Sequence, residues 1–268
     1  MDDPSNLSQG PDHLGVNAAV PEEVAIAQPP RPTKLAPVAS YLHTTATVLI
    51  MMGVAFMSWK SAKQFEQPHS PLATYLPTMI WLWLLFTFVF VGLRRRNVPL
   101  REIFGASWKT FDDFIMDVVI AIAFWFVAVL VLGVLGIAFL GSQRQNMQDA
   151  TKVLQGLAPH GALGISMWII LSLTAGVCEE FVFRGYLQRQ FSALTSSVVG
   201  GVILSAMVFA LGHLYEGGAK AALIGVFGAM FGALAAWKKN LRPGIMAHAW
   251  HDIFSGLLLS AITTHLHK

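Results

Sequence analysis

Two adjacent acids and an arginine lie at the end of a long apolar stretch in the second half of the chain. Glu179, Glu180 and Arg184 follow the uncharged run 164–177. An ionised group in such surroundings is costly unless it is paired or hydrated. At helical pitch Glu180 and Arg184 are i,i+4 neighbours that can form an ion pair, whereas Glu179 points about 100° away. The spacing predicts one anchored acid and one acid free to act as a general base, although a purely structural ion cluster would use the same residues.

Three further ionisable residues lie within apolar stretches nearer the C-terminus. His213 ends one such stretch, and His248 and Asp252 are i,i+4 neighbours on one helical face with Gly244 and Gly256. A single histidine near a helix end is more often a structural group than a catalyst. Ionisable residues on three separate apolar helices, those of His213, of His248 with Asp252, and of the acids at 179 and 180, are hard to explain as a coincidence. We therefore expect them to share one polar cavity.

The composition explains why these groups must be positioned by membrane helices. Hydrophobic residues make up 54% of the chain and charged residues 12%, with eight tryptophans. This is too apolar for an ordinary soluble domain. The basic residues do not cluster on one amphipathic element, so no nucleic-acid partner is indicated. A single cysteine, Cys178, excludes an intrachain disulfide.

Seven stretches without Lys, Arg, Asp or Glu, apart from one acid in the last, are each about long enough to cross a ~30 Å hydrocarbon layer. We therefore predict an all-α, polytopic membrane helix bundle of about seven transmembrane helices in the lipid bilayer. The stretches are Leu35–Trp59, Gln67–Leu93, Val118–Gln143, Val153–Cys178, Gln190–Tyr215, Ala221–Trp237 and Pro243–His267, the last interrupted by Asp252.

Three regions follow from this division of the chain. Residues 1–38 are rich in proline and contain no hydrophobic run, which predicts a disordered tail. Residues 39–150 hold three transmembrane helices, and residues 151–268 hold a four-helix core with all the candidate residues. Alternate sides carry twelve and six Lys and Arg residues, so the positive-inside rule predicts a cytoplasmic N-terminus. In a bacterium the protein would lie in the inner membrane.

Two structural expectations bear on the site. The fourth helix should run on past Arg184 to about Phe191 and turn near residues 192–196, which would bring Glu179 and His213 to similar depths. The stretch 221–237 carries small residues in four-residue steps, including Gly228 and Gly232, so neighbouring backbones can approach it closely.

Three ordered motifs resemble the signature of the CPBP family of intramembrane proteins. These motifs are Glu-Glu-x-x-x-Arg at 179–184, Phe-x-x-x-His at 209–213 and His-x-x-x-Asp at 248–252. The family comprises the type II CAAX prenyl endopeptidases and the bacteriocin-processing or immunity-linked Abi proteins. The resemblance covers about residues 160–260.

The resemblance implies a role for each motif residue. Glu179 and His213 would polarise the attacking water, and Glu180 with Arg184 would brace the site. His248 and the residue at position 252 would hold the developing oxyanion. Prenyl-protease members are expected to have Asn at that position, and Asp252 can donate a hydrogen bond only when protonated, so it would instead orient His248.

The sequence leaves the cofactor open. The family is often labelled as metalloproteases, and Glu179, His213 and His248 could supply a single zinc site. No pair of histidines has the i,i+4 spacing of known zinc helices, so we favour a metal-free Glu/His mechanism.

The function predicted from the sequence is an intramembrane endopeptidase. It would hydrolyse a peptide bond of a membrane-anchored or lipidated, CAAX-like protein substrate. Intramembrane Glu and His residues also mark ion pathways, so one alternative is a proton-coupled transporter. The other is a catalytically silent immunity or scaffold protein of the same fold.

Overall fold

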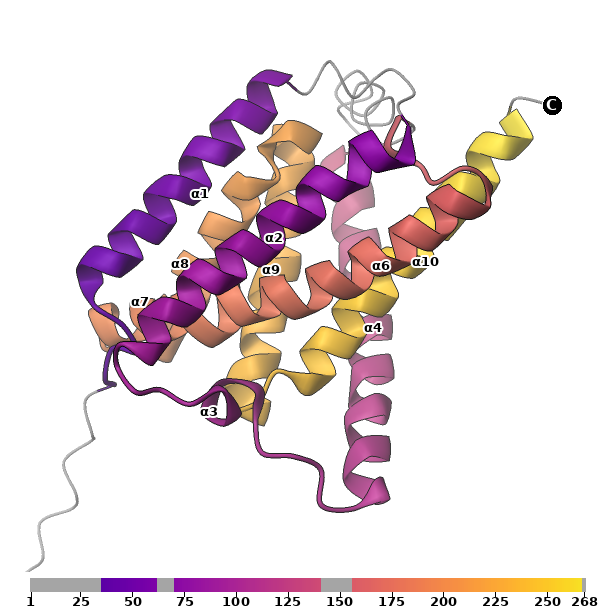
Figure 1. Cartoon of the computed structure of the whole chain (residues 1–268). Helices are drawn as coiled ribbons and strands as arrows, with labels where there is room; N and C mark the ends of the chain where they lie inside the picture. Colours follow the sequence, from indigo (N-terminus) through magenta and orange to yellow (C-terminus); the bar gives the residue numbers. More distant parts are fainter. Residues whose placement is uncertain (1–34, 62–69, 141–155, 267–268) are drawn as a thin grey trace, which may run out of the picture. The chain divides into compact units, whose positions relative to one another are not determined.

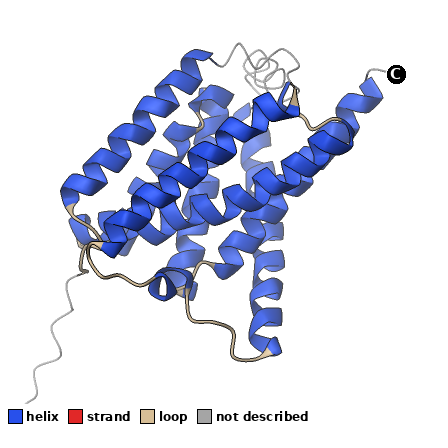
Figure 2. Cartoon of the chain, viewed as in Figure 1, coloured by secondary structure: helices blue, strands red, loops and turns tan. Residues whose placement is uncertain are grey.

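The described part of the chain is built from helices. The computed structural model describes residues 35–61, 70–140 and 156–266, and every regular element in these ranges is helical (Figures 1 and 2). This confirms the predicted all-α bundle. The predicted tail, residues 1–38, lies almost wholly outside the described residues. The helices are α1 (Tyr41–Ser61), α2 (Pro71–Arg94), α3 (Leu100–Phe104), α4 (Phe111–Leu140), α6 (Gly161–Glu179), η2 (Glu180–Leu187), α7 (Gln188–Thr195), α8 (Val198–Gly212), η3 (Leu214–Glu216), α9 (Gly218–Lys238) and α10 (Arg242–Leu266).

Six of the described helical segments are long and apolar enough to cross a membrane, counting α6, η2 and α7 as one segment of 35 residues. The 15-residue α8 is a shorter apolar helix. Together they account for the seven predicted stretches.

The start of α4 differs from the sequence prediction. The helix begins at Phe111, seven residues before the predicted start at Val118, and includes three acids. The side chain of Asp113 accepts hydrogen bonds from the backbone N–H groups of Lys109 and Thr110, and the Thr110 hydroxyl accepts one from the Asp113 N–H. This reciprocal capping satisfies N–H groups that a helix start leaves unpaired, so charged residues can open this apolar helix.

The fourth helix continues past Arg184, as predicted, and ends at Thr195. The chain turns at Ser196, which has a left-handed φ of 53°, and the Ser197 side chain caps α8 by accepting from the Gly200 N–H. The turn therefore lies at the end of the predicted range. A Cβ atom added at Gly201 would lie 1.9 Å from the Ser192 hydroxyl, so α7 and α8 pack closely because this position is glycine.

One part of this helix is not α-helical. Residues 180–187 form a π-helix, and the Gln188 N–H bonds to the carbonyl oxygen of Phe183, five residues back. All eight residues of η2 are buried. Such wide turns are rare and occur frequently at functional sites.

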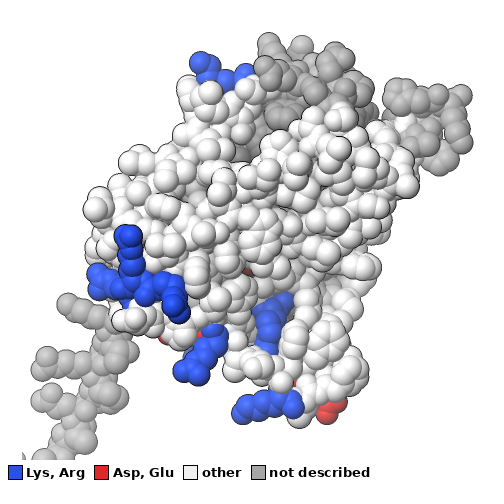
Figure 3. Space-filling model, viewed as in Figure 1, with Lys and Arg blue, Asp and Glu red and all other residues white. Residues whose placement is uncertain are grey.

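The candidate residues are positioned by neighbouring helices. In Figure 1 α6 runs beside α2, and α10 packs against α6 and α4. On the side of α6 that faces α2, Cys178 is fully buried and packs with Leu82 and Ala175. Lys and Arg gather at the end of the bundle that carries α3 (Figure 3), which is the side that the sequence predicts to be cytoplasmic.

Candidate active site

Two residues of the first motif, Glu180 and Arg184, form a buried ion pair within η2. Arg184 Nη1 lies 3.0 Å from Glu180 Oε1, and the two side chains are 2% and 1% exposed. A π-helix has wider turns than an α-helix, yet residues four apart still lie nearly above one another. The ion pair expected from the spacing is therefore present.

Arg184 is also tied to the neighbouring helix α9. Its Nη2 donates to the carbonyl oxygen of Gly228 at 3.0 Å, and one turn later Gln188 Nε2 donates to the carbonyl oxygen of Gly232 at 3.0 Å. A Cβ atom at Gly232 would lie 2.8 Å from Gln188 Oε1. The small residues of α9 thus permit the close approach that the sequence predicted, and they expose backbone oxygens that fix the arginine.

Aromatic rings complete the surroundings of the guanidinium. Its central carbon lies 4.7 Å from the ring centroid of Phe209 and 5.3 Å from that of Phe231. A cation over aromatic rings in a water-poor site is stabilised by their quadrupoles. Arg184 is therefore held from three directions, and Glu180 is held with it.

His248 on α10 connects the two acids. Its Nδ1 lies 2.9 Å from Glu180 Oε1. Because a carboxylate paired with arginine only accepts hydrogen bonds, Nδ1 carries the proton and donates it. The other ring nitrogen, Nε2, lies 3.6 Å from Glu179 Oε2 and 3.7 Å from Asp252 Oδ2. One imidazole ring is thus surrounded by three carboxylates.

The two adjacent glutamates have different environments. The Glu179 side chain is 16% exposed and the Glu180 side chain 1% exposed. Asp252, at 30%, is the most open of the three acids around the imidazole. The site therefore opens on the side of Glu179 and Asp252.

The backbone at Asp252 is fixed by α6. Trp168 Nε1 donates to the carbonyl oxygen of Asp252 at 2.8 Å. The indole lies where Gly256 leaves room, because a Cβ atom there would be 2.1 Å from Trp168 Nε1. This contact sets the rotation of α10 and with it the direction of His248.

His213 terminates α8. Its Nδ1 donates to the Phe209 carbonyl oxygen at 2.9 Å, and its ring stacks with Tyr215 at a centroid distance of 6.1 Å. The second nitrogen, Nε2, then carries the lone pair. In the part of the chain that the structure describes, the histidine within ion-pair distance of Glu179 is His248 and not His213.

Several residues near the site were not identified from the sequence. Glu216 and Lys220 form an i,i+4 ion pair of 3.1 Å, which the spacing alone could have indicated. No sequence signal pointed to Trp168, because its role depends on α10.

The sequence named Glu179, His213 and His248 as candidate ligands for a single zinc. Among the described residues no group of three or more His, Cys, Asp or Glu side chains is arranged to hold a metal ion. Nδ1 of His248 bonds to Glu180 and Nδ1 of His213 bonds to a backbone oxygen, so Nε2 is the ring nitrogen that each histidine offers to the site. Nε2 of His248 lies 3.6 Å from Glu179 Oε2.

The chain was also compared with known proteins. The model of the Rce1-like family, described as type II CAAX prenyl endopeptidase, matches residues 161–254. No curated protein and no solved structure matches the chain. The matched segment contains all six motif residues and confirms the resemblance that they carry. The segment that bears the site, residues 161–254, is therefore similar to the Rce1-like type II CAAX prenyl endopeptidases, and the six long apolar helical segments among the described residues indicate an integral membrane protein.

Proposed function

We propose that the protein is an intramembrane endopeptidase that hydrolyses a peptide bond of a membrane-anchored or lipidated, CAAX-like substrate. The observation that carries the proposal is the cluster of three carboxylates around His248, one of them paired with a buried arginine. This arrangement supplies a proton acceptor and a proton donor side by side. It suits acid–base hydrolysis at a single site.

Glu179 acts as the general base. Its carboxylate is more accessible than that of Glu180, and among the described residues the ion pair of Arg184 is with Glu180. It takes a proton from a water molecule while the water oxygen attacks the carbonyl carbon, and His213 holds the same water through Nε2. The proton then passes from Glu179 to the leaving nitrogen as the C–N bond breaks.

His248 stabilises the charge that develops on the carbonyl oxygen. A proton on Nε2 faces the open side of the site and can be donated to the oxyanion. Glu180 and Arg184 fix the ring through Nδ1, and Asp252 restrains its other edge. Asp252 is thus an orienting group in this reaction.

The substrate reaches the site through the bilayer. The basic end of the bundle, with α3, lies in the cytoplasm with the N-terminus, and in a bacterium the membrane is the inner membrane. A lipid anchor or transmembrane segment on the substrate raises its concentration at the site. The cleaved bond is near the cytoplasmic surface.

The test is Glu179→Gln in the full chain, reconstituted in proteoliposomes with a membrane-tethered reporter peptide. Loss of a general base should lower kcat by about 10²–10⁴-fold. The matched control is Asp112→Asn, which neutralises an exposed acid in the first turn of α4, away from the site. A folded Glu179→Gln protein that cleaves the reporter at the rate of the control would disprove the assignment.

A further inference from the structure

A segment outside the Rce1-like match packs against both halves of the site. Residues 99–110, here called the strap, connect α2 to α4 and include α3. The apolar stretches predicted from the sequence do not include these residues. The short helix places Ile103 in the protein interior, with 3% of its surface exposed. The contacts of the strap therefore bear on how the site is assembled.

The first contact of the strap is with the π-helix. A Cβ atom added at Gly185, the residue after Arg184, would lie 2.4 Å from Ile103 Cγ2. Phe104 stacks on Phe181 of η2, with 5.4 Å between centroids and 9° between the planes. Ile103 therefore rests directly on the backbone of the turn that holds the buried ion pair.

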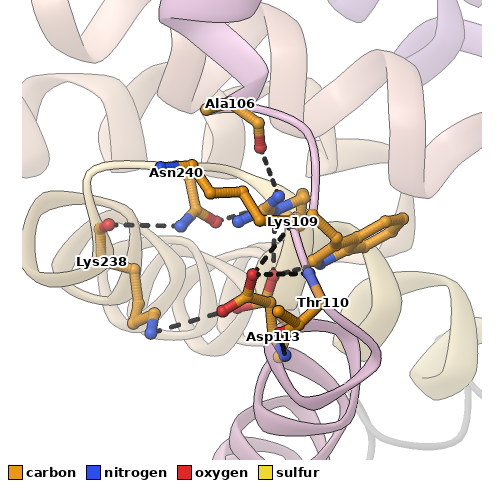
Figure 4. Close-up of polar contacts among 9 residues, drawn as sticks. Ala106, Lys109, Thr110, Asp113, Lys238 and Asn240 are labelled. Atoms are coloured by element: carbon orange, nitrogen blue, oxygen red, sulfur yellow. Dashed lines mark hydrogen bonds and ion pairs between the residues drawn. The ribbon is translucent and has the colours of Figure 1, made fainter.

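The second contact is with the start of α10. The Leu241 N–H donates to the Phe104 carbonyl oxygen, and the Arg242 guanidinium donates to the carbonyl oxygen of Ala106. A Cβ atom at Gly105, which has a φ of 93°, would lie 2.5 Å from Cβ of Asn240. Figure 4 shows Ala106 of the strap with Asn240 and Lys238 of the turn between α9 and α10.

A buried acid secures this second contact. Asp117 on α4 is 3% exposed and lies 2.9 Å from Arg242 Nε, while Trp108 Nε1 donates to its Oδ2 at 2.8 Å. The strap is thus fixed to α4 on one side and to the first residue of α10 on the other. The Gly185 position also faces Leu241 Cδ1 at 3.2 Å, so Ile103 and Leu241, the residue before α10, both pack against the same point of η2 and belong to one buried cluster.

These contacts meet at one bond of the site. The 2.9 Å bond between His248 Nδ1 and Glu180 Oε1 joins α10 to η2. Each partner lies on an element that the strap touches, His248 less than two turns from Arg242 and Glu180 about one turn from Gly185. A displacement of about 1 Å in a catalytic arrangement can cost about 10²-fold in rate.

We propose that Ile103 is a positioning residue for the reaction, packed on η2 beside Leu241, the residue before α10, so that Glu180 and His248 are held in hydrogen-bond register. The proposal rests on the proposed function for its effect on turnover. Its structural part, the register of the two side chains, can be measured without any substrate.

The test adds a methyl group at Gly185 and removes side-chain atoms from Ile103, the residue it contacts. Gly185→Ala adds a methyl group where Ile103 Cγ2 lies, and Ile103→Ala removes that atom. We expect Gly185→Ala to lower kcat about 10–100-fold with KM changed less than about twofold, because the substrate surface is untouched. The double variant Gly185→Ala/Ile103→Ala should recover at least tenfold. Gly133→Ala is the control, since nothing lies within 4 Å of a Cβ atom there.

A spectroscopic measurement separates this proposal from the proposed function. In chain labelled with ¹⁵N-histidine, the proton on His248 Nδ1 should give a downfield signal, assigned by its absence in His248→Gln. The signal should weaken or shift in Gly185→Ala and return in the double variant. If the variants show this pattern while the wild-type chain cleaves no reporter, the proposed function is refuted and the positioning role of Ile103 stands.

Two results would overturn the role of Ile103. One is a Gly185→Ala protein with unchanged kcat and an unchanged His248 signal. The other is a loss that Ile103→Ala does not reverse, because the added methyl group would then act through another neighbour.

Discussion

Replacing Arg184 by alanine removes the group that Glu180 depends on most. The side chain of Arg184 is the buried cation of the site, with one nitrogen 3.0 Å from Glu180 and another donating to the Gly228 carbonyl oxygen. After Arg184→Ala, both oxygens lose a donor in a place from which water is largely excluded. We expect the stability and the activity of the protein to fall together.

The size of the loss follows from what remains around Glu180. Breaking a buried ion pair by deleting one partner costs about 3–5 kcal/mol, because an unpaired charge stays buried. Here His248 Nδ1 still donates to Glu180 at 2.9 Å, so part of the compensation survives. We therefore expect the free energy of unfolding to fall by about 3 kcal/mol, the lower end of that range.

The double variant Glu180→Gln/Arg184→Gln separates stability from catalysis. Without a charge on either side chain the burial penalty disappears, so much of the stability should return. Activity should stay low, because a neutral amide at position 180 holds His248 less firmly and the bond from the Arg184 guanidinium to the Gly228 carbonyl oxygen is lost. Thermal melts in detergent and cleavage of the membrane-tethered reporter measure the two effects. If the loss of stability in the double variant equals the sum of the losses in Glu180→Gln and Arg184→Gln, the two residues do not act as a pair.

Two further predictions concern the metal and α10. Purified protein should contain much less than one zinc per chain, and 1,10-phenanthroline should inhibit weakly if at all, because no two histidines have the i,i+4 spacing of zinc helices and the described residues contain no group of three ligands arranged for a metal. One tightly held zinc that is lost in His213→Ala and His248→Ala would contradict this. Gly256→Ala should cost about 1–3 kcal/mol by overpacking and should lower activity, since its Cβ atom would displace the Trp168 indole. Gly133→Ala, which adds a methyl group in open space, should change neither stability nor activity. Equal losses in Gly133→Ala and Gly256→Ala would show that the contact with Trp168 is not the cause.

The part of the site that could be predicted is the part set by local spacing. Glu180 and Arg184 are four residues apart on one helix, so their pairing required no knowledge of the fold. The continuation of the same helix past Arg184 also followed, because a hairpin that turns near residues 192–196 brings Glu179 and His213 to similar depths only if the helix extends to about Phe191. The i,i+4 relation of His248 and Asp252 is local as well, and Asp252 Oδ2 does lie 3.7 Å from the imidazole.

The rest depends on contacts between segments that are far apart in the chain. The bond from His248 to Glu180 joins residues 68 positions apart, and Nε2 of the same ring lies 3.6 Å from Glu179. The π-helical form of residues 180–187 was not predictable, because it follows from packing on every side of an eight-residue turn. Ile103 could not be distinguished from any other apolar residue in a charged loop, since its importance comes from the absence of a side chain at Gly185.

Asp252 shows how one substitution can be accommodated by its neighbours. Among prenyl proteases Asn is expected at this position, and an amide could donate directly to an oxyanion. Asp252 approaches the same nitrogen, Nε2, that Glu179 approaches, so two carboxylates face one imidazole edge. Such an arrangement is favourable only when a proton is held between them, and Nε2 is the group that can carry it because Nδ1 is bound to Glu180. In the proposed reaction, an acid at 252 therefore leaves the donation to the oxyanion to His248. It also makes the firm support of His248, by Glu180 and by the Trp168 contact to the backbone of α10, more important than it would be with Asn.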